Sequence, residues 1–153
     1  VGGSAKRNMS HDMVQYINSS IFVVNNFNKT INYKILLAVD DSPGTKKAVK
    51  YGVRVAQAFG IKVQIITVNE NNNSNKANKK SSENASKMMR RCGVEAETKF
   101  EIGKPVDKIV ELAGEDHIII MGASTQSPIA KFFIGSKPLN VMQNSNCPIL
   151  IVK

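Results

Sequence analysis

Five short hydrophobic runs, separated by segments with helical spacing, constrain the fold of this chain more than any other feature of its sequence. Two of them, Tyr33 to Val39 and His117 to Met121, are apolar almost throughout, as strands covered on both faces are. A third, Val94 to Ile102, alternates apolar and polar residues, which predicts a strand with one solvated face near a sheet edge. The remaining runs are Lys62 to Asn69 and Cys147 to Val152. Strands that alternate with helices form a parallel sheet with helices on both faces, so we expect an α/β fold.

Four helices are expected between these runs. The first begins after Ser42, as the N-cap, with Pro43 at the first helical position, and it ends near Phe59. The others are expected from about Glu83 to Arg91, from Pro105 to about Gly114 and from about Lys137 to Gln143. Residues 70 to 82 are rich in Asn, Ser and Lys, and they predict a long loop that is either functional or disordered.

Small and polar residues follow two of the predicted strands at their carboxyl ends, where doubly wound sheets bind ligands. Asp40 to Ser42 follow the first strand, and Gly122 to Ser136 follow the fourth, whereas only Gly103-Lys104 follows the third. Five strands commonly take the order 3-2-1-4-5, with the switch point between strands one and four, or 2-1-3-4-5, with it between strands one and three. The asymmetry favours a five-stranded doubly wound parallel sheet in the order 3-2-1-4-5, with helices on both faces.

Bulk composition limits the class of protein and of partner. The 153 residues suffice for one domain with a real core, and 42% hydrophobic residues indicate a globular chain. A net charge of +9 favours anionic partners such as nucleotides, nucleic acid or a membrane surface. No apolar run approaches the roughly 18 residues of a membrane helix, so no membrane span is expected. Cys92 and Cys147 fit neither a disulfide framework nor a metal site, which indicates a reduced, cytoplasmic setting.

Residues 1 to 32 are interpreted as an N-terminal extension to a domain that covers residues 33 to 153. The extension is polar and rich in Asn and Ser, with one apolar patch from Ile21 to Val24. That patch fits a short added strand or a segment packed on a partner, but a partly ordered tail is the simpler interpretation. Residues 1 to 4 are read as a cloning remnant and are left out of the fold prediction.

Five motifs stand in order along the chain. They are Ile-Leu-Leu-Ala-Val-Asp-Asp-Ser-Pro-Gly at Ile35 to Gly44, Gly103-Lys104-Pro105, Ile119-Ile120-Met121-Gly122, Gly135-Ser136 and Cys147-Pro148-Ile149-Leu150-Ile151-Val152. In this order and spacing they resemble the universal stress protein family, from Tyr33 to Lys153. The resemblance implies an α/β domain that binds ATP, or ADP or AMP, with or without magnesium. It also implies a regulator or sensor in the stress response rather than a metabolic enzyme.

The resemblance further implies which residues would line the nucleotide site. Asp40 and Val68 would lie by the adenosine, and Gly122, Gly135 and Ser136 would line the phosphates. Apart from the resemblance, the polar side chains of Ser124, Ser127 and Lys137 are candidates for further phosphate contacts. In nucleotide-binding members the loop reads Gly, two residues, Gly, nine residues, Gly, then Ser or Thr. Here Thr125 stands where the second glycine belongs. A β-branched residue there either blocks the phosphates or adds a hydroxyl donor.

Each of these residues also has a plainer structural interpretation. Asp40 and Ser136 fit caps of local turns, and Gly122 and Gly135 fit backbone turns alone. His117 and both cysteines have no partner at ligand or triad spacing, so we read them as structural. The chain shows no nucleophile elbow, zinc pattern or complete P-loop lysine motif, so dedicated catalysis is not expected beyond slow ATP hydrolysis.

Two kinds of macromolecular partner are suggested by surface features. The last strand, Cys147 to Val152, would lie at the sheet edge, and an exposed apolar edge invites pairing with a second chain. With the family resemblance, this predicts a homodimer through that strand. The basic run from Lys76 to Arg91 has no aromatic residue for base stacking, so nucleic-acid binding is a minor hypothesis. The alternative to nucleotide binding is a nucleotide-free dimeric interaction module with the same fold.

Overall fold

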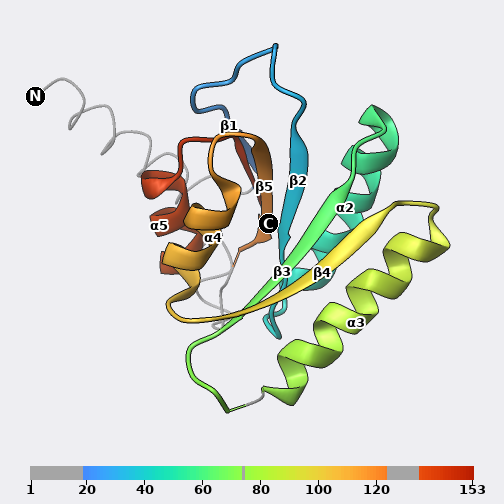
Figure 1. Ribbon diagram of the computed structural model, residues 1–153, viewed down its shortest axis with the longest axis vertical. Helices are drawn as coiled ribbons and strands as arrows, with labels where there is room; N and C mark the ends of the chain where they lie inside the picture. The colour runs from blue at the N-terminus through green and yellow to red at the C-terminus, as the bar shows by residue number, and fades with distance from the viewer. Residues whose placement is uncertain (1–18, 74, 124–134) are drawn as a thin grey trace, which may run out of the picture.

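A six-stranded sheet lies at the centre of the structure, a computed structural model that describes residues 19–73, 75–123 and 135–153. The strands are β1 (Ile21–Val23), β2 (Lys34–Ala38), β3 (Val63–Asn69), β4 (Ala96–Ile102), β5 (His117–Gly122) and β6 (Ile149–Val152). The helices of the described residues are α2 (Thr45–Phe59), α3 (Lys76–Arg91), α4 (Pro105–Ala113) and α5 (Ser136–Asn144). Helices α2 and α3 cover one face of the sheet, and α4 and α5 cover the other (Figure 1). The predicted α/β class is therefore confirmed.

The strand count and the full order differ from the prediction. The sheet has the order β1-β6-β5-β2-β3-β4, because β1 adds a sixth, antiparallel strand beside β6. The neighbouring pairs among the other five strands are parallel. Without β1 they read β6-β5-β2-β3-β4, which is the order expected of the five hydrophobic runs. Strand β4 forms one edge, as its alternating pattern predicts.

The expectation that Cys147 to Val152 offers an open sheet edge is wrong. Strand β1 pairs along β6 in the register Ile21 to Ile151 and Val23 to Ile149, so the chain itself occupies that edge. The side chains of Ile21 and Val23 pack on the core beneath α4 and α5, and Phe22 points to the opposite face with its side chain exposed. The apolar patch in the N-terminal region is thus an added strand, and not part of a tail.

Alternating residues of the central strands supply two hydrophobic cores, one on each face. Ile35 and Leu37 of β2 face α2 and α3, whereas Leu36 faces α4 and α5, and all three are fully buried. Burial on both faces is what a near-continuous apolar strand in a parallel sheet requires. Helix α2 adds Val49 and Val53 to the first of these cores.

Helix α3 begins within the segment predicted to be a loop. Asn75 is its N-cap, and the Asn75 side chain accepts hydrogen bonds from the N–H groups of Ala77 and Asn78. The buried residues of α3 recur at helical spacing: Asn78, Ser82, Ala85 and Met89. Asn and Ser are poor helix formers, which explains why local composition favours a loop. Capping and burial of this stripe override that preference.

The loop after β2 and the end of β5 approach each other backbone to backbone. A Cβ atom on Gly44 would overlap the carbonyl oxygen of Ala123, and one on Gly122 would overlap the backbone of Gly44. Gly122 has no positive φ, so its role here is close approach and not an unusual backbone conformation. These two glycines bring together the carboxyl ends of β2 and β5, between which the predicted order puts the switch point.

Gly122→Ala should lower the free energy of unfolding by about 1 to 3 kcal/mol, because the added methyl group has no space against the Gly44 backbone. Chemical denaturation monitored by circular dichroism measures the loss. Gly93→Ala is the control: Gly93 has a φ of +69° and no neighbour within 4 Å, so alanine strains only its own backbone, by about 1 kcal/mol. A Gly122→Ala protein as stable as wild type would contradict the close packing.

Candidate functional site

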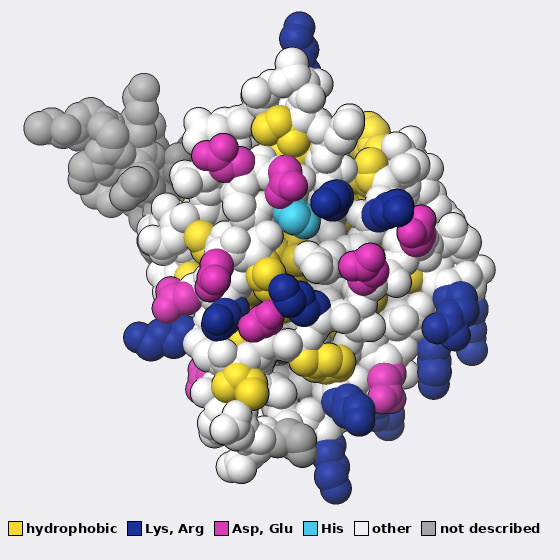
Figure 2. Space-filling view, viewed as in Figure 1, with side chains coloured by type: hydrophobic (Ala, Val, Ile, Leu, Met, Phe, Trp, Pro, Cys, Tyr) yellow, Lys and Arg dark blue, Asp and Glu magenta, His cyan; other side chains and the backbone are white. Residues whose placement is uncertain are grey.

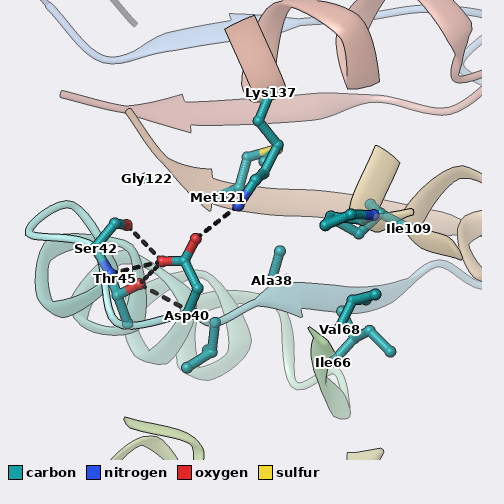
Figure 3. Close-up of a pocket in the computed structure, with 12 residues that line it drawn as sticks. Ala38, Asp40, Ser42, Thr45, Ile66, Val68, Ile109, Met121, Gly122 and Lys137 are labelled. Carbon is teal, nitrogen blue, oxygen red and sulfur yellow. Dashed lines mark hydrogen bonds and ion pairs between the residues drawn. The ribbon is translucent and has the colours of Figure 1, made fainter. Parts of the chain in front are cut away.

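The carboxylate of Asp40, directly after β2, is the centre of a hydrogen-bond network. Its Oδ1 accepts from the backbone N–H and the hydroxyl of Ser42, at 3.0 and 2.5 Å, and from the hydroxyl of Thr45 at 2.9 Å. Thr45 Oγ1 in turn accepts from the Asp40 N–H at 3.2 Å. These bonds fix the orientation of the carboxylate at the carboxyl end of the sheet (Figure 3).

The other carboxylate oxygen of Asp40 meets a lysine from a distant part of the chain. Lys137 Nζ, from the first turn of α5, donates to Asp40 Oδ2 at 3.0 Å, and Figure 3 shows its side chain reaching across β5. Both side chains are partly buried, with 34% of Lys137 and 27% of Asp40 exposed. A cation and an anion therefore stand together where the loop after β2 meets the start of α5.

Burial and hydrogen bonding act in opposite directions on Asp40. Burial disfavours the charged carboxylate and by itself raises the pKa of Asp40. The hydrogen bonds from Ser42 and the charge and hydrogen bond of Lys137 lower it, and together they hold the pKa of Asp40 below its ordinary value. Asp40 is therefore ionised at neutral pH.

Two helix starts at the site differ from the expected capping. Helix α2 begins at Thr45 with Gly44 as its N-cap and no side-chain cap, because the Ser42 hydroxyl donates to Asp40 instead. Helix α5 begins at Ser136, with Gly135 as the N-cap at a φ of 87°. A side chain rarely adopts that φ, so a glycine is needed at this turn. Pro138 follows in the first turn and has no N–H, so the backbone donors at the start of α5 include those of Ser136 and Lys137.

A narrow cavity opens beside this ion pair. Its volume is about 30 Å³, enough for a water molecule but not for a nucleotide. The polar wall carries Asp40, Ser42, Thr45 and Lys137 (Figure 3). The apolar wall is formed by Ala38, Val39, Ile66, Val68, Pro105, Ile109, Met121 and Gly122. The cavity thus combines a charged rim with a hydrophobic floor, as small-molecule sites usually do.

A second, larger pocket adjoins the first and is rich in amide side chains. Its volume is about 290 Å³, near the lower end of the roughly 300 to 1,000 Å³ of small-molecule sites. It shares Asp40, Val68, Pro105 and Lys137 with the narrow cavity, and adds Asp41, Asn69, Glu70, Asn71, Asn73, Asn75 and Asn78. Amide groups both donate and accept hydrogen bonds, so this pocket can bind polar heterocycles and hydroxyl groups.

Asn78 holds the two halves of this pocket in place. Its side-chain oxygen accepts from the N–H of Asp41 at 2.9 Å, and its Nδ2 donates to Asn69 Oδ1 at 2.9 Å. The Asn78 side chain is buried, so these bonds are shielded from water. Neither Asn69 nor Asn78 is among the predicted site residues, since Asn69 ends the predicted strand from Lys62 and Asn78 falls in the predicted loop of residues 70 to 82. Only the helical spacing of Asn78 with Ser82 and Met89 could have indicated an inward side chain.

Comparison with known proteins identifies the family. The pattern of the Universal stress protein family matches residues 32–153. The chain belongs to the universal stress protein family. The universal stress protein YxiE of Bacillus subtilis is 28% identical over 145 residues, covering 78% of this chain and 98% of that protein.

Two solved structures of family members carry a nucleotide. A universal stress protein in complex with cAMP superimposes with a TM-score of 0.61 and 25% identity, over 80% of this chain and 98% of that one. The universal stress protein of Archaeoglobus fulgidus in complex with dAMP has a TM-score of 0.61 and 21% identity, over 80% and 99%. At 21% identity, the similarity to the dAMP complex shows a shared fold only.

The predicted site residues of this universal stress protein fall into three groups. Asp40, Val68, Gly122 and Lys137 line the narrow cavity. Gly135 and Ser136 form the start of α5, the helix that carries Lys137. Thr125, with Ser124 and Ser127, lies outside the described residues, so its two alternatives stay predictions.

Two reactive side chains of this universal stress protein are engaged in structural contacts. His117 Nδ1 lies 3.0 Å from the carbonyl of Ala113 and 2.8 Å from Asp116 Oδ1. Cys147 is fully buried, and burial raises the pKa of its thiol to about 11, which suppresses the reactive thiolate. Among the described residues, no group of three His, Cys, Asp or Glu side chains could hold a metal ion.

The basic run of α3 forms a solvated surface. Figure 2 shows Lys and Arg side chains gathered over α3, at the lower right of the molecule. The basic residues of α3 are Lys76, Lys79, Lys80, Lys87, Arg90 and Arg91, and all are exposed. Within the part of the chain that the structure describes, no helix is both long and apolar enough to cross a membrane.

Asp40→Asn should make stability less dependent on pH in the acid range. Because the folded protein holds the pKa of Asp40 below its unfolded value of about 3.9, the unfolded chain binds the proton more tightly. The stability from ionised Asp40 is therefore full above about pH 4 and is lost as pH falls through the lowered pKa.

Denaturant unfolding of wild type and variant from about pH 6 down to pH 3 measures this difference. Asp41→Asn is the control. Asp41 is the exposed neighbour of Asp40, and only its backbone N–H, not its carboxylate, takes part in the hydrogen bonds described above. A parallel loss of stability by Asp40→Asn and wild type on acidification would contradict a lowered pKa of Asp40 in the folded protein.

Proposed function

We propose that this universal stress protein binds an adenine nucleotide, in the first place ATP, and acts as a stress-response regulator or sensor rather than as a metabolic enzyme. One observation carries the proposal: the Asp40–Lys137 pair stands between a narrow cavity and an amide-lined pocket, at the carboxyl ends of β2, β3 and β5. Ligands of doubly wound sheets bind at that place. The cAMP complex of another family member supports the choice of an adenine nucleotide.

In this proposal the two pockets receive different parts of the nucleotide. The amide-lined pocket takes the base and ribose, beside Asp40 and Val68, because amide side chains and a carboxylate offer both donors and acceptors. The phosphates lie toward Gly122 and the start of α5. The donor set suits an anion there: the first N–H groups of a helix lack intrahelical partners, and Lys137 adds a positive charge. The negative charge of the bound phosphates would be attracted to these N–H groups and to Lys137.

Binding would require Lys137 to change its partner. Lys137 neutralises Asp40 and lines the narrow cavity of about 30 Å³. Phosphate would draw Lys137 away, and a ribose hydroxyl could donate to the vacated Asp40 oxygen. Occupancy would thus alter the surface around Gly122 to Ser136, and with it the partner that the protein binds. Magnesium, where present, would be held mainly by phosphate oxygens.

A second candidate function is a nucleotide-free interaction module with the same fold. Two observations favour this second function: the cavity is too narrow for a nucleotide, and Asp40 and Lys137 already neutralise each other's charge.

The substitution Thr125→Gly discriminates between the two predicted roles of Thr125, obstruction of the loop and contact with the ligand. The substitution should raise nucleotide affinity if threonine obstructs the loop, and should lower it or leave it unchanged if threonine contacts the ligand.

Homodimerisation and a cytoplasmic location remain proposals for this chain. A homodimer through Cys147 to Val152 would first require β1 to leave β6, so that strand is not available as it stands.

Lys137→Met should weaken ATP binding about tenfold or more, because a charge-assisted hydrogen bond to phosphate is lost while the stem of the side chain keeps its volume. Isothermal titration calorimetry with ATP and magnesium measures the dissociation constant. Lys87→Met, an exposed lysine of α3, is the matched control and should bind like wild type.

A wild-type protein that gives no binding heat with ATP, ADP, AMP or cAMP, and that Thr125→Gly does not rescue, would overturn nucleotide binding. The interaction module would then be the function to pursue. Equal weakening by Lys137→Met and Lys87→Met would instead show that only net charge matters.

A further inference from the structure

The net charge of the chain is concentrated on the two helices that cover one face of the sheet. Helices α2 and α3 contain ten of the 21 Lys and Arg residues but one of the 12 Asp and Glu residues, Glu83. The net charge of the two helices is therefore +9, which equals that of the whole chain, so the remaining charges cancel. We call the surface of these ten side chains the basic layer: Lys46, Lys47, Lys50 and Arg54 of α2, and Lys76, Lys79, Lys80, Lys87, Arg90 and Arg91 of α3.

The basic runs of α2 and α3 form one surface because the two helices lie side by side (Figure 1). A Cβ atom on Gly52 of α2 would lie 3.3 Å from the Met89 side chain of α3, so the helices are in direct contact. Near their C-terminal ends, Gln57 Nε2 donates to the carbonyl oxygen of Cys92 at 3.0 Å. The buried side chains of both helices pack on the sheet, and all ten basic residues are exposed. The fold thus joins two basic runs that a strand separates in the sequence.

The side chains of the basic layer form no ion pair with a carboxylate of the described residues. The lysines that do form ion pairs lie outside α2 and α3: Lys62, Lys99, Lys108 and Lys137. Within α2, Lys46, Lys50 and Arg54 follow one another at four-residue intervals, and like charges at that spacing repel each other. An anionic partner would relieve this repulsion, which favours binding of a polyanion.

The exposed side of α3 carries a straight row of cations. Lys76, Lys80, Lys87 and Arg91 are separated by four, seven and four residues, which places them on one side of the helix, opposite its buried stripe. At 1.5 Å per residue, the row is about 22 Å long. A row of this length matches an extended anion with many charges, and not a single small anion.

We propose that the basic layer binds double-stranded DNA through its phosphate backbone, without reading its sequence. A DNA duplex carries one negative charge about every 1.7 Å along its axis, so cations on α3 and α2 can meet several phosphates at once. Contacts of lysine and arginine with phosphates position the duplex but carry no sequence information. Release of the counterions that condense on the duplex would drive binding. The exposed helix α3 also suits the major groove of DNA, which is wide enough for a helix, whereas that of duplex RNA is narrow.

A duplex fits the basic layer better than a single strand does. Proteins bind single strands by stacking the bases on aromatic side chains. Helix α3 has no aromatic residue, and α2 has two. The guanidinium of Arg54 covers the Tyr51 ring, 5.9 Å from its centroid, and Phe59 borders an apolar groove beside Ile118 of β5. The lack of aromatic residues in the basic run therefore argues against a single strand, but not against the backbone of a duplex.

A duplex also fits the basic layer better than an anionic membrane does. Helices that lie on a bilayer bury an apolar face among the lipids. The apolar sides of α2 and α3 are already packed on the sheet, and Met88, at 37%, is the one exposed large hydrophobic residue of α3. The basic layer can therefore offer a partner charge and hydrogen-bond donors, which are what a phosphate backbone requires.

Fluorescence anisotropy of a labelled, mixed-sequence DNA duplex of ~20 base pairs, titrated with the full chain, tests the proposal. Wild type should bind with a dissociation constant between about 1 and 100 μM at ~150 mM salt. Its affinity should fall at least about a hundredfold between about 50 and 200 mM salt. Lys80→Gln, Lys87→Gln and Arg91→Gln combined should weaken binding at least about tenfold and reduce the slope of log affinity against log salt by about 2 to 3. Glutamine is a helix former comparable to lysine and arginine, so this variant should stay folded, which circular dichroism reports.

The matched control combines Lys29→Gln, Lys34→Gln and Lys104→Gln, which removes the same charge from exposed lysines outside the basic layer. It should bind the duplex within about twofold of wild type, since charges away from the contact are screened by salt. Lys137→Met should bind the duplex like wild type, and the α3 triple variant should bind ATP like wild type. DNA binding by the basic layer and nucleotide binding beside Asp40 can therefore fail independently of each other.

Four results would overturn the proposal. The first is no change in anisotropy with ~100 μM protein at ~50 mM salt. The second is equal weakening by the control triple variant, which would assign binding to net charge alone. The third is tighter binding of the single strand, or of an RNA duplex of the same sequence. The fourth is tighter binding of phosphatidylserine vesicles or of poly-glutamate, lost in the α3 triple variant, which would assign the basic layer to a membrane or to an acidic protein.

Discussion

The contact between Gly44 and Gly122 is the constraint on which the site depends. Neither residue has a Cβ, so the loop after β2 and the end of β5 meet backbone to backbone. That approach sets Asp40 beside β5, and the chain that continues from β5 returns as α5 with Lys137 in its first turn. A side chain on either glycine would separate the two elements. An ion pair of 3.0 Å between residues 97 positions apart needs them held at this spacing.

The charge balance at Asp40 explains how a partly buried carboxylate stays ionised. Burial works against the carboxylate, while the Ser42 and Thr45 hydroxyls and the Lys137 ammonium compensate for the lost water. Under the proposed function, a ligand with phosphate and hydroxyl groups would exchange with Lys137 without leaving Asp40 unpaired.

Much of the sheet could be predicted because β2 and β5 are near-continuous apolar runs, whereas contacts between distant segments could not. The start of α3 was missed because Asn and Ser favour loops locally, while its position depends on Asn78 bonding to Asp41, 37 residues away. Strand β1 has only three residues, and its pairing comes from β6 at the other end of the sequence. Asp40 and Lys137 were singled out by family resemblance and phosphate chemistry, but their contact follows from the fold alone. The amide-lined pocket was not foreseen, since its walls come from β3, α3, α4, α5 and the loops after β2 and β3.

The most direct test of the central claim is to denature freshly purified protein and to identify by chromatography any nucleotide that it releases. Nucleotide binding at the Asp40–Lys137 site predicts an adenine nucleotide in near-stoichiometric amount from wild type, and much less from Lys137→Met. A protein that releases none, and that remains empty after incubation with excess ATP and magnesium, would contradict the account.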